Sequence, residues 1–297
     1  MNNPPDSSLP IASYWEAENA RDKSVRCLLC PQCCVIVDGH TGFCGARTNR
    51  GGVLYADCYG IVSSASLDPI EKKPLYRFHP GSGIFSIGSY GCNLRCAFCQ
   101  NHSIAAAPSG NFLSTPHSPQ QIVDYAASLT QNGNIGIAYT YNEPLIGYEY
   151  VMDCAVLAHE RGLKNVAVTN GFINPEPLRA LLPYLDALNI DLKGFTDGFY
   201  EKLSGRLDPV KESIATAAQS AHVEVSALII PGENDLDAEM DGMAAFLAGI
   251  SKDIPLHIAR FFPRHRMTDK QPTSREAILR LKYIAEKHLV YVYAGNF

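Results

Sequence analysis

The sequence predicts an α/β protein in which a parallel β-sheet covered by helices follows a small cysteine-rich module. Three observations support this prediction. Short apolar runs alternate with amphipathic stretches after residue 83, the alternation repeats about every 25 to 35 residues, and nine of the ten cysteines lie before residue 100. Alternation at this spacing implies right-handed crossovers between parallel strands, in either an open doubly wound sheet or a barrel.

Each element of the larger region follows from the local pattern. Strands are expected at residues 84–88, 135–140, 165–169, 187–191, 223–230, 256–261 and 289–293. Helices are expected at residues 119–131, 145–161, 176–184, 209–221, 236–249 and 274–288. These are six strand–helix units and a final strand, and the active site is expected at the carboxyl ends of the strands.

The region before the sheet divides into two parts. Residues 1–25 are rich in Pro, Ser and Asn and are expected to form a flexible lead-in, with a short helix around residues 14–20. Residues 26–83 combine cysteines and glycines with short β-prone pieces at 34–37, 53–59 and 61–64. This composition predicts an accessory module that depends on a metal to fold, followed by the core domain over residues 84–297.

Composition excludes several classes of protein. The chain has 297 residues, of which 46% are hydrophobic and 19% charged, so it is too apolar to be disordered. Its formal charge of −5 argues against a nucleic-acid partner. It contains no uninterrupted apolar run of about 18 residues, and its first residues lack the layout of a signal peptide. We therefore expect a cytoplasmic protein that does not bind a membrane.

Three cysteines follow the first strand of the core in the segment GCNLRCAFCQN, as Cys92, Cys96 and Cys99. Thiolates are ligands for zinc and for iron–sulfur clusters, and a structural zinc or an ordinary 4Fe–4S cluster takes four of them. This loop offers three, and Cys154 is expected to be buried in the middle of a helix. The spacing therefore predicts a 4Fe–4S cluster with one iron open to substrate or cofactor.

This C-x3-C-x2-C spacing resembles that of the radical S-adenosylmethionine (SAM) enzymes. The resemblance covers residues 84–297 and implies a partial TIM-type (β/α)6 radical SAM barrel. Further phrases closely resemble the radical SAM enzyme of the AmmeMemoRadiSam system, a branch similar to the activating enzymes of glycyl-radical enzymes such as pyruvate formate-lyase. They are PIEKKPLYRFHPGS (69–82), CQN (99–101), TYNEP (140–144), TNGF (169–172), NIDLKGF (189–195) and LIIPGEND (228–235).

The resemblance implies a mechanism. A reduced 4Fe–4S cluster binds SAM at its open iron and releases methionine and a 5′-deoxyadenosyl radical, which abstracts hydrogen from a substrate. An external electron donor such as flavodoxin or ferredoxin is implied. The substrate, either a small molecule or a glycine of a partner protein, is not identified by the sequence. A non-catalytic iron–sulfur electron-transfer protein is the alternative from a different functional class.

The resemblance also implies roles for residues that bind the cofactors. Phe98 corresponds to an aromatic ring that lies against adenine, and Asn101 corresponds to a residue that contacts the cluster or SAM. Glu143 stands where relatives carry a glutamate that accepts a hydrogen bond from the SAM amino group. Asn142 replaces a glycine of that motif, so it either adds a side-chain contact or shifts the SAM pose. The alternative for Glu143 is an ordinary exposed glutamate before a helix.

Three more residues come from later strands. Asp191 and Lys193 match an Asp-Leu-Lys motif of the related enzymes, whose residues lie next to SAM and help to bind a monovalent cation. The alternative is a simple salt bridge at the end of a strand. His257 matches a histidine that lies near the SAM ribose or carboxylate, with a structural histidine as the alternative.

The front module carries a second candidate metal site, formed by Cys27, Cys30, Cys34 and Cys44, if Cys33 is the extra thiol. Four thiols at these spacings suit either a structural zinc or a second 4Fe–4S cluster, and both readings stay open. Buried free thiols are the alternative. Cys58, in a β-prone piece, is expected to contribute to packing.

Overall fold

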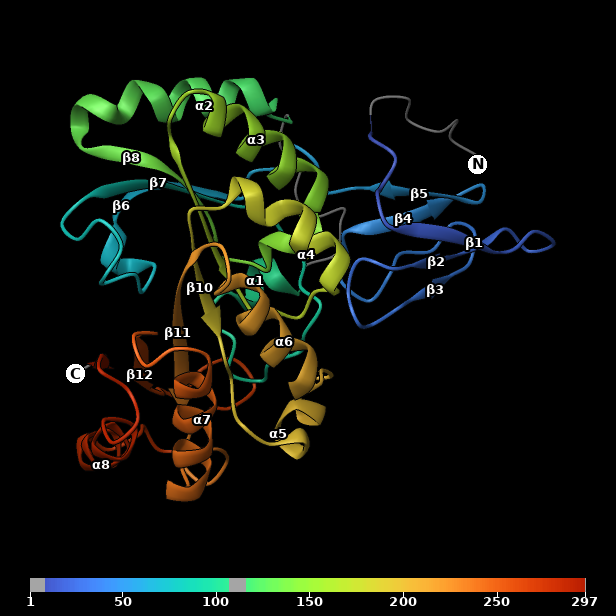
Figure 1. The fold of residues 1–297 in the computed structure, drawn as a ribbon. Coiled ribbons are helices and arrows are strands. Elements are labelled where there is room, and N and C mark those ends of the chain that lie inside the picture. Colours follow the sequence, from blue (N-terminus) through green and yellow to red (C-terminus); the bar gives the residue numbers. More distant parts are fainter. Residues whose placement is uncertain (1–8, 107–115, 297) are drawn as a thin grey trace.

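The protein is described here by a computed structural model that covers residues 9–106 and 116–296. Its centre is an eight-stranded sheet with the strand order β13-β12-β11-β10-β9-β8-β7-β6 (Figure 1). The strands are β6 (Ser64–Pro69), β7 (Gly83–Gly88), β8 (Asn134–Tyr139), β9 (Lys164–Thr169), β10 (Ala187–Asp191), β11 (His222–Ile229), β12 (Leu256–Arg260) and β13 (Val292–Gly295). Strands β7 to β13 are parallel, whereas β6 pairs antiparallel with β7 at one edge.

Neighbouring strands of this sheet are also neighbours in the chain. The sheet therefore winds in one direction, as in a barrel, with β6 and β13 at its two open edges. This order confirms the partial barrel and excludes the doubly wound sheet, whose strand order reverses at a switch point.

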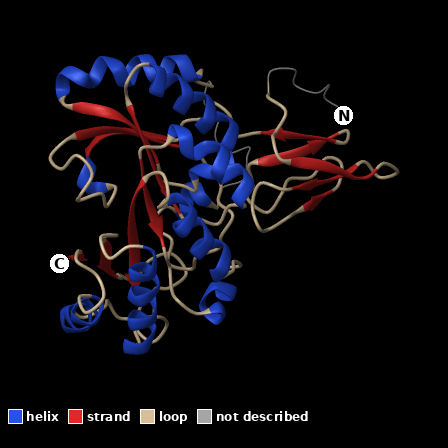
Figure 2. Ribbon diagram, viewed as in Figure 1, coloured by secondary structure: helices blue, strands red, loops and turns tan. Residues whose placement is uncertain are grey.

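Helices follow the strands along one side of the sheet (Figure 2). The six predicted helices are present as α2 (Pro119–Ser128), α3 (Tyr148–Glu160), α4 (Pro175–Leu181), α6 (Leu207–Ala217), α7 (Asp237–Ile250) and α8 (Arg275–Ala285). Short 3-10 turns extend three of them, at η3 (Leu129–Asn132), η4 (Pro144–Gly147) and η5 (Leu182–Tyr184). Two short helices, α1 (His102–Ala105) and α5 (Asp197–Lys202), are not predicted by the sequence because each is too short to show periodicity.

The core lies between the sheet and these helices. Ile190 and Val225 of adjacent strands are buried, as are Ala155 of α3 and Leu281 of α8. Among the described residues, no helix combines the length and the apolar character that a membrane span requires.

The front of the chain forms two small sheets. Strands β1 (Trp15–Asn19), β2 (Ser24–Cys27) and β3 (Val35–Ile36) make one, and β4 (Arg47–Arg50) pairs with β5 (Val53–Ala56) in the other. The short helix expected around residues 14–20 is therefore wrong. Pairing with β2 gives this segment its extended form, and such a contact overrides local propensity.

Two other predicted boundaries are corrected. Residues 61–63 are not in a strand, and β6 begins only at Ser64. The last strand begins at Val292 rather than at residue 289, because the amide of Leu289 still donates to the carbonyl of Ala285 at the end of α8.

The division at residues 25 and 83 also cuts through paired strands. The pairing of β1 with β2 crosses the first boundary, and the pairing of β6 with β7 crosses the second. Residues 1–8 of the expected lead-in lie outside the described part of the chain.

Candidate active site at the carboxyl ends of the strands

The loop that carries Cys92, Cys96 and Cys99 leaves the carboxyl end of β7 and ends at α1. All three cysteines are partly buried. The amide of Cys92 donates to the carbonyl of Cys44 at 3.1 Å, which joins this loop to the front module. Gly91 permits this approach, because it has a φ of +85° and a Cβ there would lie 2.5 Å from the Cys44 oxygen.

The loop after β8 holds the cysteine loop at both ends. Asn142 accepts a hydrogen bond from the Ser89 amide at 2.9 Å and donates to the Tyr90 carbonyl at 3.0 Å. Asn101, just after the third cysteine, donates to the Tyr141 carbonyl at 2.6 Å. Both asparagines therefore position the loop, and their amide groups are engaged with the backbone.

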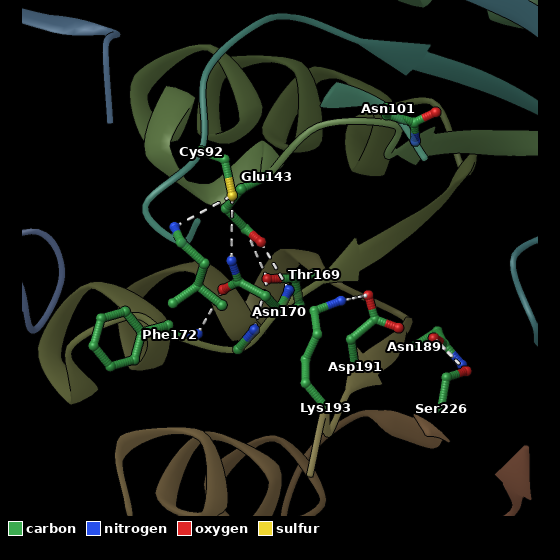
Figure 3. Close-up of polar contacts among 12 residues, drawn as sticks. Cys92, Asn101, Glu143, Thr169, Asn170, Phe172, Asn189, Asp191, Lys193 and Ser226 are labelled. Atoms are coloured by element: carbon green, nitrogen blue, oxygen red, sulfur yellow. Dashed lines mark hydrogen bonds and ion pairs between the residues drawn. The ribbon is translucent and has the colours of Figure 1, made fainter. Parts of the chain in front are cut away.

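Glu143 is buried beside this loop, which excludes the exposed glutamate considered from sequence. Its carboxylate accepts hydrogen bonds from the Thr169 hydroxyl at 2.7 Å and the Asn170 amide at 2.7 Å (Figure 3). It also accepts from the Leu145 amide at 3.0 Å. Burial raises the pKa of Glu143 to about 7, although these hydrogen bonds act in the opposite direction. A cationic group placed against this carboxylate would favour its charged form.

Asn170 connects Glu143 to the first cysteine, a role that no candidate residue was assigned from sequence. Its side-chain amide donates to the side-chain oxygen of Asn93 at 2.9 Å. The same amide lies 3.7 Å from the Cys92 sulfur (Figure 3). The Leu94 amide lies 3.4 Å from the same sulfur. The sequence signal that could have indicated this role of Asn170 was the pair Asn170-Gly171 directly after the third parallel strand, where site residues are expected.

Asp191 is the last residue of β10, and Lys193 lies two residues further along the chain. The Lys193 ammonium lies 2.7 Å from the Asp191 carboxylate. Burial acts to lower the pKa of Lys193, but Asp191 and then Cys96 outweigh it and raise that pKa. Burial also raises the pKa of the Cys96 thiol to about 11, against the charge of Lys193. Cys96 is therefore protonated at neutral pH unless a metal binds its thiolate.

Phe98 lies apart from these polar groups. Its side chain is 6% exposed and stacks on Phe199 at 6.3 Å between ring centroids, in an apolar cluster with Leu203, Ile230 and Phe261. Contact of Phe98 with adenine stays a prediction.

His257 is the second residue of β12 and lies in register with Ser226 of β11, which in turn lies in register with Asp191 of β10. Its Nε2 lies 2.6 Å from a carboxylate oxygen of the buried Glu224, and its ring packs on Tyr76 and Tyr293. A place for His257 near the SAM ribose or carboxylate stays a prediction.

The four predicted ligands of the front module do come together. Cys27, Cys30, Cys34 and Cys44 line one small cavity. Cys33 has a φ of +43°, does not line the cavity, and places its sulfur 3.6 Å from the carbonyl of Cys30.

Two cysteines remain outside both groups. Cys58 and Cys154 are buried, as expected, and Cys154 lies in α3 beside Tyr150. The rim loop thus offers three thiols, which matches a cluster held at three of its irons.

Known proteins resemble the chain in sequence and in fold. The radical SAM superfamily matches residues 86–245. The chain is 42% identical over 283 residues to the uncharacterized protein MJ0808 of Methanocaldococcus jannaschii, an alignment that covers 94% of this chain and 83% of that protein. It is 22% identical over 173 residues to the pyruvate formate-lyase-activating enzyme of Clostridium pasteurianum, with coverage of 57% and 72%.

A solved structure agrees in fold. Streptococcus suis SuiB bound to S-adenosylmethionine superposes with a TM-score of 0.55 at 15% identity, over 70% of this chain and 48% of SuiB. The sequence-based prediction of the superfamily and of its α/β fold is thus confirmed, and membership implies a 4Fe–4S cluster and SAM as cofactors. The chain belongs to the radical SAM superfamily.

Proposed function

We propose that this protein is an enzyme that reductively cleaves SAM and abstracts hydrogen from a substrate with the resulting 5′-deoxyadenosyl radical. Cys92, Cys96 and Cys99 would hold the 4Fe–4S cluster, which supplies the electron for cleavage when bound. One observation carries the proposal. The three-thiol loop shares the carboxyl rim with Glu143, a buried carboxylate that contacts two backbone amides and a hydroxyl.

Glu143 is proposed to accept a hydrogen bond from the SAM amino group. Thr169 and Asn170 hold its carboxylate in place, so it would not reorganise when the ligand binds. Burial raises the pKa of Glu143 to about 7 despite the charge of Lys193, and the ammonium of SAM in contact with the carboxylate would favour its charged form. Asp191 and Lys193 are proposed to border the same ligand, with the Lys193 charge offsetting that of the thiolates.

Asn170 and the Leu94 amide are proposed to stabilise the Cys92 thiolate. N–H groups directed at a ligating sulfur withdraw negative charge, and such contacts contribute to the reduction potential of a cluster. Asn101 and Asn142 contribute by fixing the loop, and Phe98 by covering the apolar side of the site.

The substrate defines two versions of the proposal. The resemblance to the AmmeMemoRadiSam branch leaves the hydrogen donor unspecified, whereas the similarity to the C. pasteurianum activating enzyme favours a glycine of a partner protein. Both versions need an external one-electron donor of low potential, such as flavodoxin or ferredoxin. The proposal also includes a metal on the front-module cysteines, either zinc or a second 4Fe–4S cluster. A purely electron-transferring protein would not need the Glu143 site.

The test is formation of 5′-deoxyadenosine. The protein is reconstituted anaerobically with iron and sulfide, reduced with dithionite and given SAM, and the nucleoside is measured by mass spectrometry. We expect turnover in the wild type and in Cys33→Ser, which changes a thiol outside both groups of cysteines, and none in Cys96→Ala. Turnover in Cys96→Ala would contradict the proposal. Deuterated candidate substrates, including a partner protein labelled at glycine, would then identify the donor by label in the nucleoside.

A further inference from the structure

We propose that the front module holds a second 4Fe–4S cluster on Cys27, Cys30, Cys34 and Cys44, which passes electrons to the cluster on Cys92, Cys96 and Cys99. The site itself stands independently of SAM cleavage, whereas the electron transfer rests on the proposed function.

The four thiols surround a common space although they come from different segments. Cys27 ends β2, Cys34 precedes β3, and Cys44 lies in the turn before β4. All four line the same cavity, whose remaining walls are largely apolar, and the Phe43 amide lies 3.5 Å from the Cys34 sulfur. The site therefore offers four sulfur ligands around one space.

Arg47 adds a buried donor that faces the same cavity. Its side chain is 1% exposed, and its terminal nitrogen donates to Glu149 at 2.8 Å and to the Ser13 carbonyl at 2.6 Å. Its Nε–H has no hydrogen-bond partner among the described residues, although Arg47 lines the cavity. A buried donor without a partner is costly, and a thiolate or cluster sulfide would accept from it. The positive charge of Arg47 also offsets the charge of a four-thiolate cluster.

The place of the thiols beside the rim loop favours a cluster over zinc. Four thiolates can hold either group, and zinc would only stabilise the fold, because it does not change its oxidation state. A 4Fe–4S cluster does change its oxidation state, so four thiols next to Cys92, Cys96 and Cys99 suit an electron relay only if they hold a cluster.

The two sites are direct neighbours. The Cys92 amide donates to the Cys44 carbonyl at 3.1 Å, so one ligand of each site is joined by a single hydrogen bond. A second connection passes through Asn93, which contacts the Cys30 thiol and accepts from Asn170, whose amide lies 3.7 Å from the Cys92 sulfur. An external low-potential donor would reduce the front cluster by one electron. That cluster would return to its oxidised state as it reduces the rim cluster by one electron.

The first experiment measures metal rather than activity. The variant in which Cys92, Cys96 and Cys99 are all alanine is reconstituted anaerobically, and its iron, sulfide and zinc are quantified. We expect about four irons and four sulfides per chain and the electron paramagnetic resonance (EPR) signal of a reduced 4Fe–4S cluster. Stoichiometric zinc, or no metal, would overturn the proposal. Bound iron without SAM cleavage in the wild type would instead refute only the proposed function.

A matched pair of variants guards against misfolding. Cys34→Ser removes a cavity thiol, and Cys33→Ser removes the adjacent thiol that does not line the cavity. With the rim cysteines intact, we expect Cys34→Ser to lose about half of the roughly eight irons and Cys33→Ser to lose none. Equal iron in the two variants would refute the site.

The second experiment tests the electron transfer. Two reduced clusters at neighbouring sites couple magnetically, so the EPR spectrum of the reduced wild type should be broader than the sum of the spectra of Cys34→Ser and the triple alanine variant. A spectrum equal to that sum would overturn the transfer between them.

Discussion

The two ends of the sheet each bury a glutamate, and the two glutamates differ in their electrostatics. At the amino end, Glu224 accepts from the Tyr76 amide at 3.0 Å and the Arg77 amide at 2.7 Å, and it lies 2.9 Å from His222 and 2.6 Å from His257. Although burial acts in the other direction, these hydrogen bonds lower the pKa of Glu224 to about 2. At the carboxyl end, burial raises the pKa of Glu143 to about 7.

The difference shows which end is complete without a ligand. Glu224 has its partners within the protein and therefore stabilises the fold as a charged group. Among the described residues Glu143 has no ion pair, and burial outweighs its hydrogen bonds and the charge of Lys193, so its charged form is disfavoured until a cation contacts it. A buried glutamate thus stabilises the fold at the amino end, whereas at the carboxyl end, where the active sites of such sheets lie, Glu143 is proposed to bind a ligand.

The largest expected effect is on the free energy of unfolding, from a substitution of Glu224 at the amino end of the sheet. Glu224→Gln removes a carboxylate whose pKa of about 2 lies well below its ordinary value of 4.5, so we expect the free energy of unfolding at pH 7 to fall by about 3 kcal/mol. Urea denaturation of the apoprotein, monitored by circular dichroism, would measure it. A change within 0.5 kcal/mol, roughly that of a surface substitution, would contradict the assigned role.

The same residue predicts a pH dependence. Because the folded pKa of about 2 lies below the unfolded value of 4.5, the stabilisation is fully present above about pH 5 and is lost as the pH falls toward 2. The stability difference between wild type and Glu224→Gln should therefore shrink over this range. A difference that stays constant from pH 6 to pH 3, within roughly 0.5 kcal/mol, would show that Glu224 acts without its charge.

The next largest effect is expected on the Kd for SAM, from a substitution of Glu143 at the carboxyl end of the sheet. Glu143→Gln removes the charged acceptor proposed for the SAM ammonium, so we expect the Kd for SAM to rise about tenfold to hundredfold. Stability should fall less than in Glu224→Gln, because ionised Glu143 is unfavourable in the free protein. Calorimetric titration of the reconstituted protein tests the first part and urea denaturation the second. An unchanged Kd would remove Glu143 from the SAM site.

A smaller effect is expected at Asn170. Asn170→Ala removes a donor near the Cys92 sulfur, and loss of such contacts around metal ligands typically weakens metal binding by about tenfold or more. Iron release to a chelator should be faster than in the wild type. Asn296→Ala provides a control, because its amide donates to the Arg260 carbonyl far along the chain. Equal release from all three proteins would leave Asn170 with only a structural role.

The smallest effect is expected away from both ends. Asp124 and Arg161 form an exposed ion pair between α2 and the end of α3. Exposed pairs contribute little, so Asp124→Asn should change neither the unfolding midpoint in urea nor the Kd for SAM. A clear change in the unfolding midpoint or in the Kd would show that an exposed charge on a helix also affects these quantities. The comparison of Glu224 with Glu143 would then no longer isolate the effect of burial and partners.

Much of the fold and part of the site could be predicted from local pattern. The parallel strands and their helices were found because each repeats an apolar period of its own, and Cys92, Cys96 and Cys99 because their spacing is local. The contact of His257 with Glu224 could not be predicted, because a strand pattern gives the face on which a residue lies but not the side chains that meet it from the next strand. Strand β1 was missed because its conformation depends on pairing with β2.

By itself, the sequence determined the order of strands and helices, the three-thiol loop and the set of four front cysteines, because these depend on neighbours in the chain. Only the tertiary structure decided that Glu143 is buried against Thr169 and Asn170, that Glu224 is held by two histidines, and that Cys44 contacts Cys92. The contacts of Glu143 with Thr169, of Glu224 with His257 and of Cys44 with Cys92 each join residues more than 20 positions apart, so the local sequence does not reveal them. Burial and hydrogen-bond partners, rather than residue type, set the charge of Glu143 and Glu224.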